Sequence, residues 1–175
     1  MEKTLLERKS KRIIKYMKKQ YKIIVNLIKK YKNNEDCIDV GTKELAPTED
    51  SIKRVEQVLK IKLPKSYLWF LKNYGYIIIF GEELFSISNK IEDIDLTTSD
   101  IEYNYFWYKN KSFIGNNEIP IFDDEFGKLY VMDTLKMDNY GEYPIYSRYN
   151  ETGEEKVFYA NNFLSFLEKQ LKDCE

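Results

Sequence analysis

The chain has 175 residues, enough for a domain with a buried core, and its 28 basic and 29 acidic residues nearly cancel. It contains no histidine, which excludes Ser-His-Asp and Cys-His nucleophilic sites and histidine-based metal sites. The sequence also lacks a glycine-rich phosphate loop. We therefore expect a protein that is not an enzyme and that has no cofactor and no bound metal.

Charge is distributed unevenly along the sequence. Residues 1–32 contain 12 Lys and Arg against Glu2 and Glu7, a net charge of +10. This leaves 16 of the 28 basic and 27 of the 29 acidic residues for the remainder, a net charge of −11. A basic arm is thus joined to an acidic body. An acidic body suits a cationic partner, and we expect no direct nucleic-acid binding.

Several features predict a cytoplasmic location. The two cysteines, Cys37 and Cys174, lack metal-ligand spacing, and so few cysteines predict free thiols in a reducing compartment. The charged N-terminus has no apolar core of a signal peptide. The longest apolar run, residues 76–80, is too short to cross a bilayer, so we expect no stable membrane insertion.

The first part of the chain predicts a long helix. Apolar residues recur every three or four positions across residues 3–32, with lysines between them. We expect residues 1–19 to form a basic helical extension and residues 20–175 to form a single domain. A helix docked by one face is the favoured interpretation of the extension, and contact with a membrane surface or nucleic acid is the alternative. Residues 33–47 predict a loop.

Residues 51–75 predict two amphipathic helices separated by a break at Pro64. Thr48 or Ser51 is expected to cap the first helix. Pro64 suits the first turn of the second helix, because its missing N–H would have no partner there. Gly75 can take the left-handed conformation that ends the second helix.

The pattern then changes to strands. Residues 76–80 and 83–87 flank a predicted tight turn at Gly81-Glu82. Two further strand pairs follow: residues 119–122 with 128–132, and residues 142–148 with 156–159.

Two more helices complete the predicted elements. Residues 101–109 have a weaker helical pattern, and Asn161 or Asn162 is expected to cap a closing helix. The order of helices, antiparallel strands and a last helix predicts an α+β fold. In this fold a mainly antiparallel central sheet is packed by helices.

Several motifs coincide with those of one superfamily. They are the helix–Leu63-Pro64–helix segment ending at Tyr74-Gly75, Ile119-Pro120-Ile121-Phe122-Asp123, the Gly127–Asp133 strand, and the terminal Phe163-Leu164 and Phe166-Leu167. Over residues 20–173 the chain resembles the SUKH superfamily, the Smi/Knr-type domain, and within it the bacterial YobK-like immunity proteins. Tyr76 and Phe126 stand where the family commonly has glycine, which implies altered turns.

The resemblance implies an α+β domain without a cofactor or a reaction of its own. Bacterial members are implied to bind and block the toxic C-terminal domain of a polymorphic toxin, often a nuclease. Eukaryotic members are implied to be intracellular regulatory or scaffold modules. The leading prediction is therefore an immunity protein whose partner is a cognate protein toxin domain, and the alternative is a regulatory module.

Acidic turns and one aromatic segment contain the candidate toxin-binding residues. Carboxylates would steer a cationic partner, and tyrosine and tryptophan would supply most of the affinity. The acidic candidates are Glu82, Glu83, Asp123, Asp124 and Glu125. The aromatic candidates are Tyr103, Tyr105, Trp107 and Tyr108, for which burial in the core is an equal alternative.

Two alternatives use the same carboxylates. Asp123, Asp124, Glu125 and Asp133 would serve as acid and base in a carboxylate-dependent glycosidase, although acidic turn residues are far more often simply solvated. A calcium site in the turn at residues 123–125 is the other alternative, but the spacing does not match an EF-hand loop.

Overall fold

The computed structural model describes residues 2–90, 99–124, 126–149 and 155–174. The helices are α1 (Glu2–Tyr31), α2 (Glu49–Leu59), α3 (Lys65–Tyr74), α4 (Ile101–Asn110) and α5 (Phe163–Lys172). The strands are β1 (Ile38–Val40), β2 (Ile77–Ile79), β3 (Glu82–Glu83), β4 (Glu118–Asp123), β5 (Lys128–Asp133), β6 (Ile145–Tyr149) and β7 (Val157–Ala160). Short 3₁₀ turns lie at Lys43–Leu45 and Thr134–Lys136.

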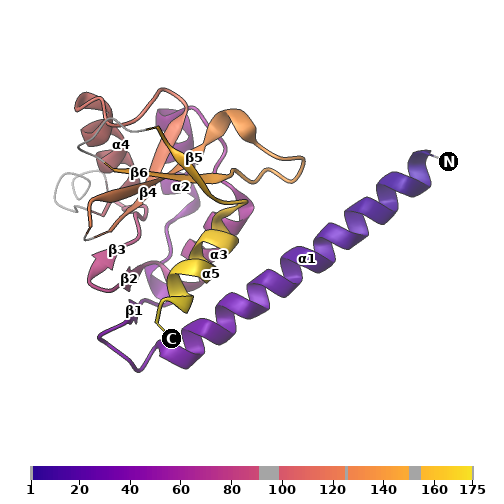
Figure 1. Cartoon of the computed structure of the whole chain (residues 1–175), viewed down its shortest axis with the longest axis horizontal. Helices are drawn as coiled ribbons and strands as arrows, with labels where there is room; N and C mark the ends of the chain where they lie inside the picture. Colours follow the sequence, from indigo (N-terminus) through magenta and orange to yellow (C-terminus); the bar gives the residue numbers. More distant parts are fainter. Residues whose placement is uncertain (1, 91–98, 125, 150–154, 175) are drawn as a thin grey trace.

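The strands form two antiparallel sheets, in the orders β1-β2-β3 and β4-β5-β6-β7 (Figure 1). The Phe85 N–H donates to the Ile121 carbonyl at 2.8 Å, which joins the chain after β3 to β4. The predicted α+β fold with mainly antiparallel strands is confirmed, with two sheets in place of one. The loop predicted at residues 33–47 contains β1, which pairs with β2. Three residues are too few for a strand period to be recognised in the sequence.

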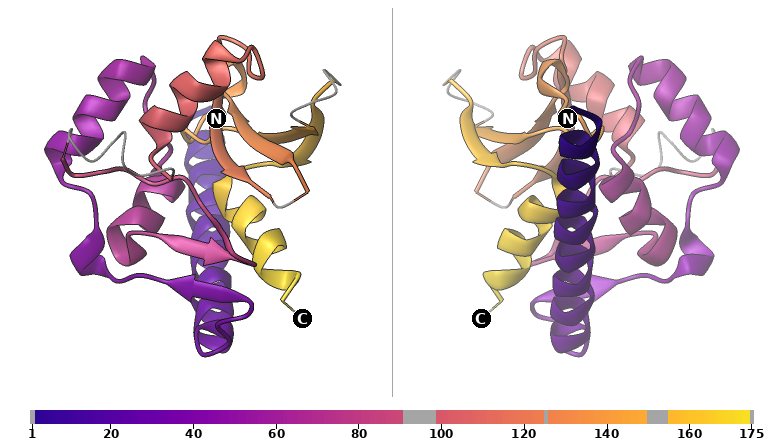
Figure 2. Two further views of the ribbon diagram at one scale, coloured as in Figure 1. Left: turned by 90° about the vertical axis from the view of Figure 1, so that its left-hand side faces the viewer. Right: turned by 90° about the vertical axis from the view of Figure 1, so that its right-hand side faces the viewer.

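α1 is a long rod whose N-terminal part projects beyond the rest of the molecule (Figure 1). Figure 2 shows its C-terminal part beside α5. Its C-terminal part packs through buried Ile24, Ile28 and Tyr31, which recur every three or four residues. α1 lies along α5, where the Gln20 amide donates to the Ser165 hydroxyl at 2.7 Å. The predicted helix at residues 3–32 is confirmed. Among the helices of the described residues, none combines the length and apolar character needed to cross a membrane.

The predicted helix pair corresponds to α2 and α3. Thr48 caps α2 by accepting a backbone N–H bond, and Gly75 ends α3 with a φ of 75°. Pro64 lies one position earlier than predicted, as the residue before α3 rather than in its first turn. A carboxylate distant in sequence serves this helix end, because Glu142 accepts the Ser66 N–H at 3.1 Å.

The turn between β2 and β3 is Phe80-Gly81, one residue earlier than the predicted Gly81-Glu82. Ile79 pairs with Glu82, and the φ angles of Phe80 and Gly81 are 50° and 90°. Two positive φ angles in a two-residue loop characterise a type I′ turn. The prediction was wrong because Phe80, as an apolar residue, was assigned to the strand.

The aromatic face of α3 packs against α5. The rings of Tyr67, Phe70 and Phe166 surround Phe163, with centroids 5.2, 5.8 and 6.2 Å from that of Phe163. All four side chains are fully buried. Residues 51–75 therefore supply core packing, and α5 lies between α1, α3 and the four-stranded sheet.

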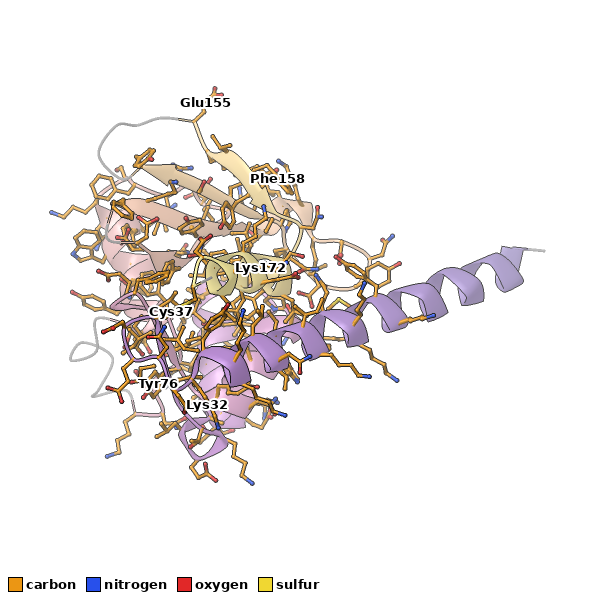
Figure 3. The ribbon with its side chains drawn as sticks, turned by 60° about the horizontal axis from the view of Figure 1, so that its bottom comes forward. Lys32, Cys37, Tyr76, Glu155, Phe158 and Lys172 are labelled. Carbon is orange, nitrogen blue, oxygen red and sulfur yellow. A yellow bond between two sulfur atoms is a disulfide. The ribbon has the colours of Figure 1, made fainter. Side chains whose placement is uncertain are left out.

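Cys37 and Cys174 form a disulfide, which contradicts the predicted free thiols (Figure 3). The two cysteines are 137 residues apart in sequence, and their Cα atoms lie 5.8 Å apart. This Cα distance is typical of natural disulfides. The prediction used only the number of cysteines, which carries no information on which cysteines the fold brings together.

Candidate functional site

Two adjoining pockets lie beside β3 and the end of β4, and they share Glu82. The larger has a volume of about 390 Å³ and lies where the β2–β3 and β4–β5 hairpins meet. Its lining includes Phe80, Phe126, Glu82, Asp124, Lys128 and Asp173. The smaller has a volume of about 200 Å³, and its lining includes Glu83, Ser99, Asn104, Tyr108 and Asp123.

Exposed phenylalanines stand at both hairpin turns of the larger pocket. Phe80 is 43% exposed and Phe126 is 76% exposed. Large exposed aromatics at a pocket are a common feature of protein-binding surfaces. Sequence reasoning did not select them as site residues. The sequence contains a signal, since each precedes a glycine and glycine marks turns. Both glycines, Gly81 and Gly127, have a positive φ in the structure.

Asp124 holds the turn that carries Phe126. Its Oδ1 accepts the N–H of Phe126 at 3.0 Å and that of Lys128 at 2.9 Å, and its Oδ2 accepts the Tyr130 hydroxyl at 3.3 Å. Burial, together with the nearby Asp124 charge, raises the pKa of Tyr130, so the hydroxyl keeps its proton and acts as the donor. The carboxylate of Asp124 therefore has a structural part in shaping the pocket.

Carboxylates in the smaller pocket interact with hydroxyl groups. The Tyr108 hydroxyl donates to the Asp123 carboxylate. Burial raises the pKa of Glu83, a Ser99 hydrogen bond lowers it in part, and the negative charge of Asp39 raises it further. The pKa of Glu83 is raised overall, so its environment disfavours the ionised form. A cation brought by a partner would offset this penalty.

α4 lies beside the smaller pocket, which its Asn104 and Tyr108 line, and it carries the four aromatic candidates. Tyr108 is buried and lines this pocket, whereas Trp107 is 41% exposed on the helix surface. Tyr103 and Tyr105 are half-buried. Phe106, which was not predicted, is 45% exposed. The aromatic segment is thus divided between the core and the surface.

The pockets bring together five of the nine predicted residues: Glu82, Glu83, Tyr108, Asp123 and Asp124. Three of the remaining four predicted residues, Tyr103, Tyr105 and Trp107, lie on α4 but do not line either pocket. Glu125 lies outside the described residues.

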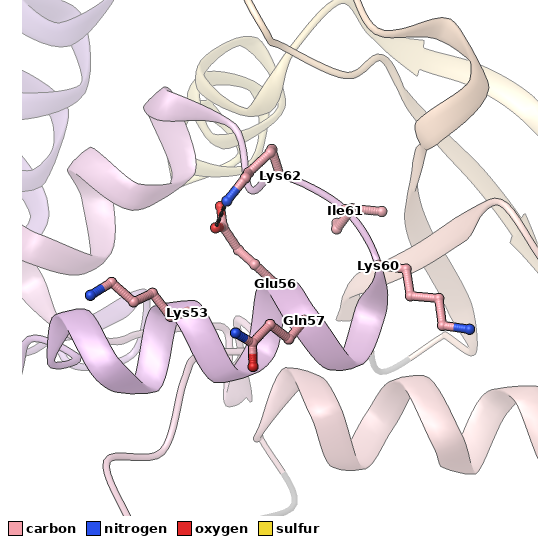
Figure 4. Close-up of a pocket in the computed structure, with 6 residues that line it drawn as sticks. All are labelled: Lys53, Glu56, Gln57, Lys60, Ile61 and Lys62. Atoms are coloured by element: carbon pink, nitrogen blue, oxygen red, sulfur yellow. Dashed lines mark hydrogen bonds and ion pairs between the residues drawn. The ribbon is translucent and has the colours of Figure 1, made fainter.

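A third pocket, of about 380 Å³, has the opposite charge. Lys53, Lys60 and Lys62 line it with Glu56, near the end of α2 (Figure 4). The Lys62 ammonium pairs with the Glu56 carboxylate at 2.6 Å. None of the predicted residues lines this pocket.

Asp133, named above as a possible catalytic carboxylate, is in a different environment. It is 2% exposed, and its Oδ2 lies 3.0 Å from the Lys156 ammonium and 3.4 Å from that of Lys136. Burial alone would raise the pKa of Asp133, but Lys156, the Leu135 N–H and Lys136 together lower it. An ionised carboxylate held between two ammonium groups is a poor proton donor. In the described part of the chain, no three His, Cys, Asp or Glu residues are grouped to hold a metal ion.

The fold places this chain among α+β domains in which helices pack against two antiparallel sheets. The SUKH_5 family model, described as SMI1-KNR4 cell-wall, matches residues 24–172. The chain belongs to this family, which confirms the predicted SUKH, Smi/Knr-type resemblance. SUKH domains are generally non-enzymatic binding modules of immunity or Smi/Knr type, and the family indicates interaction with proteins.

Proposed function

We propose that this chain is an immunity protein that binds and neutralises the toxic C-terminal domain of a cognate bacterial polymorphic toxin, of nuclease type. The main observation in support is the pair of acidic pockets flanked by exposed aromatics in a SUKH-family domain. The predicted closeness to YobK-like proteins belongs to this proposal.

The chemistry of a nuclease site makes such a surface a suitable inhibitor. A nuclease holds phosphates with cationic side chains, and carboxylates can occupy the same positions. Glu82 and Glu83 are half-buried on one edge of the pockets, where they would steer a cationic partner. Phe80, Phe126 and Trp107 would then bury apolar area against it, which supplies affinity.

Co-expression with the toxin encoded beside this gene tests the proposal. We expect cells that produce the toxin to survive with the wild-type protein and to die with the charge-reversed E82K/D173K variant. The control for a single charge reversal outside the pockets is E155K, because Glu155 is exposed next to β7 (Figure 3). If cells die as fast with the wild-type protein as without it, and the two proteins form no complex, the proposal is wrong.

The proposal includes the absence of catalysis. Asp123 accepts a hydroxyl from Tyr108, and Asp133 is ion-paired, so neither carboxylate has the environment of a catalytic acid. The glycosidase alternative predicts that D123N or D133N abolishes turnover of a glycan while the protein stays folded. Glycan hydrolysis by the wild-type protein would contradict the proposed absence of catalysis.

A regulatory or scaffold module is the second candidate, and the family description, SMI1-KNR4 cell-wall, favours it. Both candidates are protein binders, so genetic context separates them. A regulator should have no adjacent toxin gene, and its deletion should alter growth in the absence of any toxin.

We further propose that the protein acts in the cytoplasm, where a nuclease toxin would find its substrate. The disulfide between Cys37 and Cys174 makes this location testable, since cytosolic proteins normally keep their thiols reduced. Rapid alkylation of intact cells followed by mass spectrometry should then find two adducts per chain. An unmodified, oxidised pair would contradict a cytoplasmic location.

We propose the same domain division as before, with residues 1–19 as a basic extension and residues 20–175 as the domain. The family match begins at residue 24, and the N-terminal part of α1 projects from the body (Figure 1). A variant lacking residues 1–19 should therefore fold and still neutralise the toxin. Loss of folding would show that the extension belongs to the domain.

A further inference from the structure

The larger pocket combines a negative charge with exposed aromatic rings. We propose that it binds an arginine side chain of the protein partner. This inference rests on the proposed function only for the identity of that partner as a toxin. The recognition of the arginine itself is argued from the pocket.

No salt bridge between described residues neutralises the carboxylates of the pocket. Among the described residues, none of Glu82, Asp124 and Asp173 takes part in a salt bridge. Lys128 is the single basic residue in the described lining, and its ammonium lies 5.4 Å from the ring centroid of Tyr149 on β6. Three carboxylates against one ammonium favour a cationic occupant.

Both aromatic side chains are carried by turns that hydrogen bonds hold in place. The Phe80 N–H donates to the Cys37 carbonyl at 2.8 Å, and Asp124 accepts the N–H of Phe126. These bonds fix the backbone N–H groups of both phenylalanines, which reduces the backbone entropy lost when a partner binds.

A guanidinium suits this pocket better than an ammonium. Its plane stacks on a phenyl ring, while its N–H groups form paired hydrogen bonds with a carboxylate. Glu82 and Asp173 supply carboxylates next to Phe80 and Phe126. The volume of about 390 Å³ is within the range of sites that enclose a small ligand.

The smaller pocket is a poorer arginine site. There the Tyr108 hydroxyl donates to Asp123, and Ser99 donates to Glu83, so a guanidinium would compete with donors already present. Asp124 is similarly engaged in the larger pocket, but within the described residues no side-chain hydrogen bond of this kind involves Glu82 or Asp173.

Two isosteric probes test the proposal without the toxin. Isotope-labelled protein is titrated with N-acetylarginine amide and, separately, with the neutral N-acetylcitrulline amide, while backbone amide NMR signals are followed. We expect arginine to shift the amides of Phe80, Glu82, Phe126 and Asp173 in a saturable way, with a Kd of about 1 mM. Citrulline should cause no saturable shift.

Single variants then assign the contacts. E82Q, D173N and F126A should each raise the Kd for N-acetylarginine amide about two- to fivefold, as expected for exposed charge and ring contacts. E155Q removes one negative charge away from the pocket and should leave the Kd unchanged. Equal shifts with citrulline, shifts at other surfaces, or unchanged affinity in all three variants would overturn the pocket assignment. Arginine binding without rescue from a toxin would instead overturn only the proposed function.

Discussion

Carboxylates have opposite surroundings in two regions of this protein. At one end of the four-stranded sheet, Glu118 accepts two hydrogen bonds of 2.7 Å from Arg148 and lies 2.9 Å from the Lys156 ammonium. At the pockets, Glu82 and Asp173 belong to no salt bridge of the described residues. The sheet end uses its acids to satisfy the chain's own cations. The pockets leave acids available to another molecule.

The pKa directions agree with this difference. Burial would raise the pKa of Glu118, but the Gly115 N–H, Lys156 and Arg148 lower it overall. At the pockets, burial raises the pKa of Glu83 and its Ser99 bond reverses only part of that increase. Arg148 and Lys156 offset the cost of burying Glu118, whereas no described cation pairs with Glu83, which is retained at a cost and is a candidate for function.

Removal of the disulfide should have the largest effect on stability. The disulfide joins two segments of the chain that lie beside the larger pocket. Cys37 accepts the Phe80 N–H through its carbonyl, and Cys174 follows Asp173. The C37A/C174A variant should lose about 4 kcal/mol of unfolding free energy, since the bond joins residues separated by 137 positions in sequence. Urea unfolding measures this loss, and the wild-type protein in reductant should match the variant.

The same variant also tests whether the disulfide acts on the pockets rather than on the sheet end. Hydrogen exchange should accelerate at Phe80 and Gly81 before it changes at β4 and β5. Uniform acceleration over the whole chain would contradict a local role.

Breaking the ion pairs of the sheet end should have the next largest effect. In R148A the buried Glu118 keeps Lys156 and the Gly115 N–H as partners but loses Arg148, and the unfolding free energy should fall by about 3 kcal/mol. The matched control is K72A, because the Lys72–Glu49 pair is largely exposed and should contribute less than about 1 kcal/mol. Similar losses in both variants, measured by urea unfolding, would show that burial does not distinguish the two pairs.

The disulfide and the Glu118–Arg148 pair also show what the sequence can and cannot predict about the fold. The ends of α2 and α3 were predictable because caps and apolar periodicity are local signals, as at Thr48 and Gly75. The short strand β1, the disulfide and the Glu118–Arg148 pair depend on contacts between distant residues. Such contacts leave no periodic pattern in one sequence.

The site was predicted in part for a similar reason. Acidic turns are recognisable by composition, so the sequence alone predicts Glu82 and Asp124, which line the larger pocket. The aromatic segment was ambiguous because Tyr108 and Trp107 are neighbours on a helix, and only packing decides which of them is buried. Phe126 was noted as a departure from a family glycine, but its exposure depends on the turn held by Asp124.

The pH dependence of stability should distinguish the two regions with a smaller effect. The folded pKa of Glu118 is lowered, so its contribution is present above its unfolded pKa and is lost as the pH falls through the folded value. The folded pKa of Glu83 is raised, so its contribution is fully present below its unfolded pKa and is lost as the pH rises through the folded value.

Glutamine variants measure these contributions. At pH 7, E118Q should destabilise the protein and E83Q should stabilise it by less than about 1 kcal/mol, because Glu83 is only half-buried. Both differences from the wild-type protein should shrink as the pH falls below 4. If E118Q and E83Q changed the unfolding free energy in the same direction, Glu118 and Glu83 would not have opposite surroundings.

Substitution of Glu82 and Asp173 should have the smallest effect on stability and the largest effect on binding. Glu82 is half-buried and Asp173 is exposed, and in the described residues neither has an ion-pair partner to lose. E82Q/D173N should therefore change the unfolding free energy by no more than about 0.5 kcal/mol. The same variant should lose most of its affinity for N-acetylarginine amide and for the toxin. A strongly destabilised variant would mean that these acids belong to the scaffold, as Glu118 does, and the contrast between the two regions would fail.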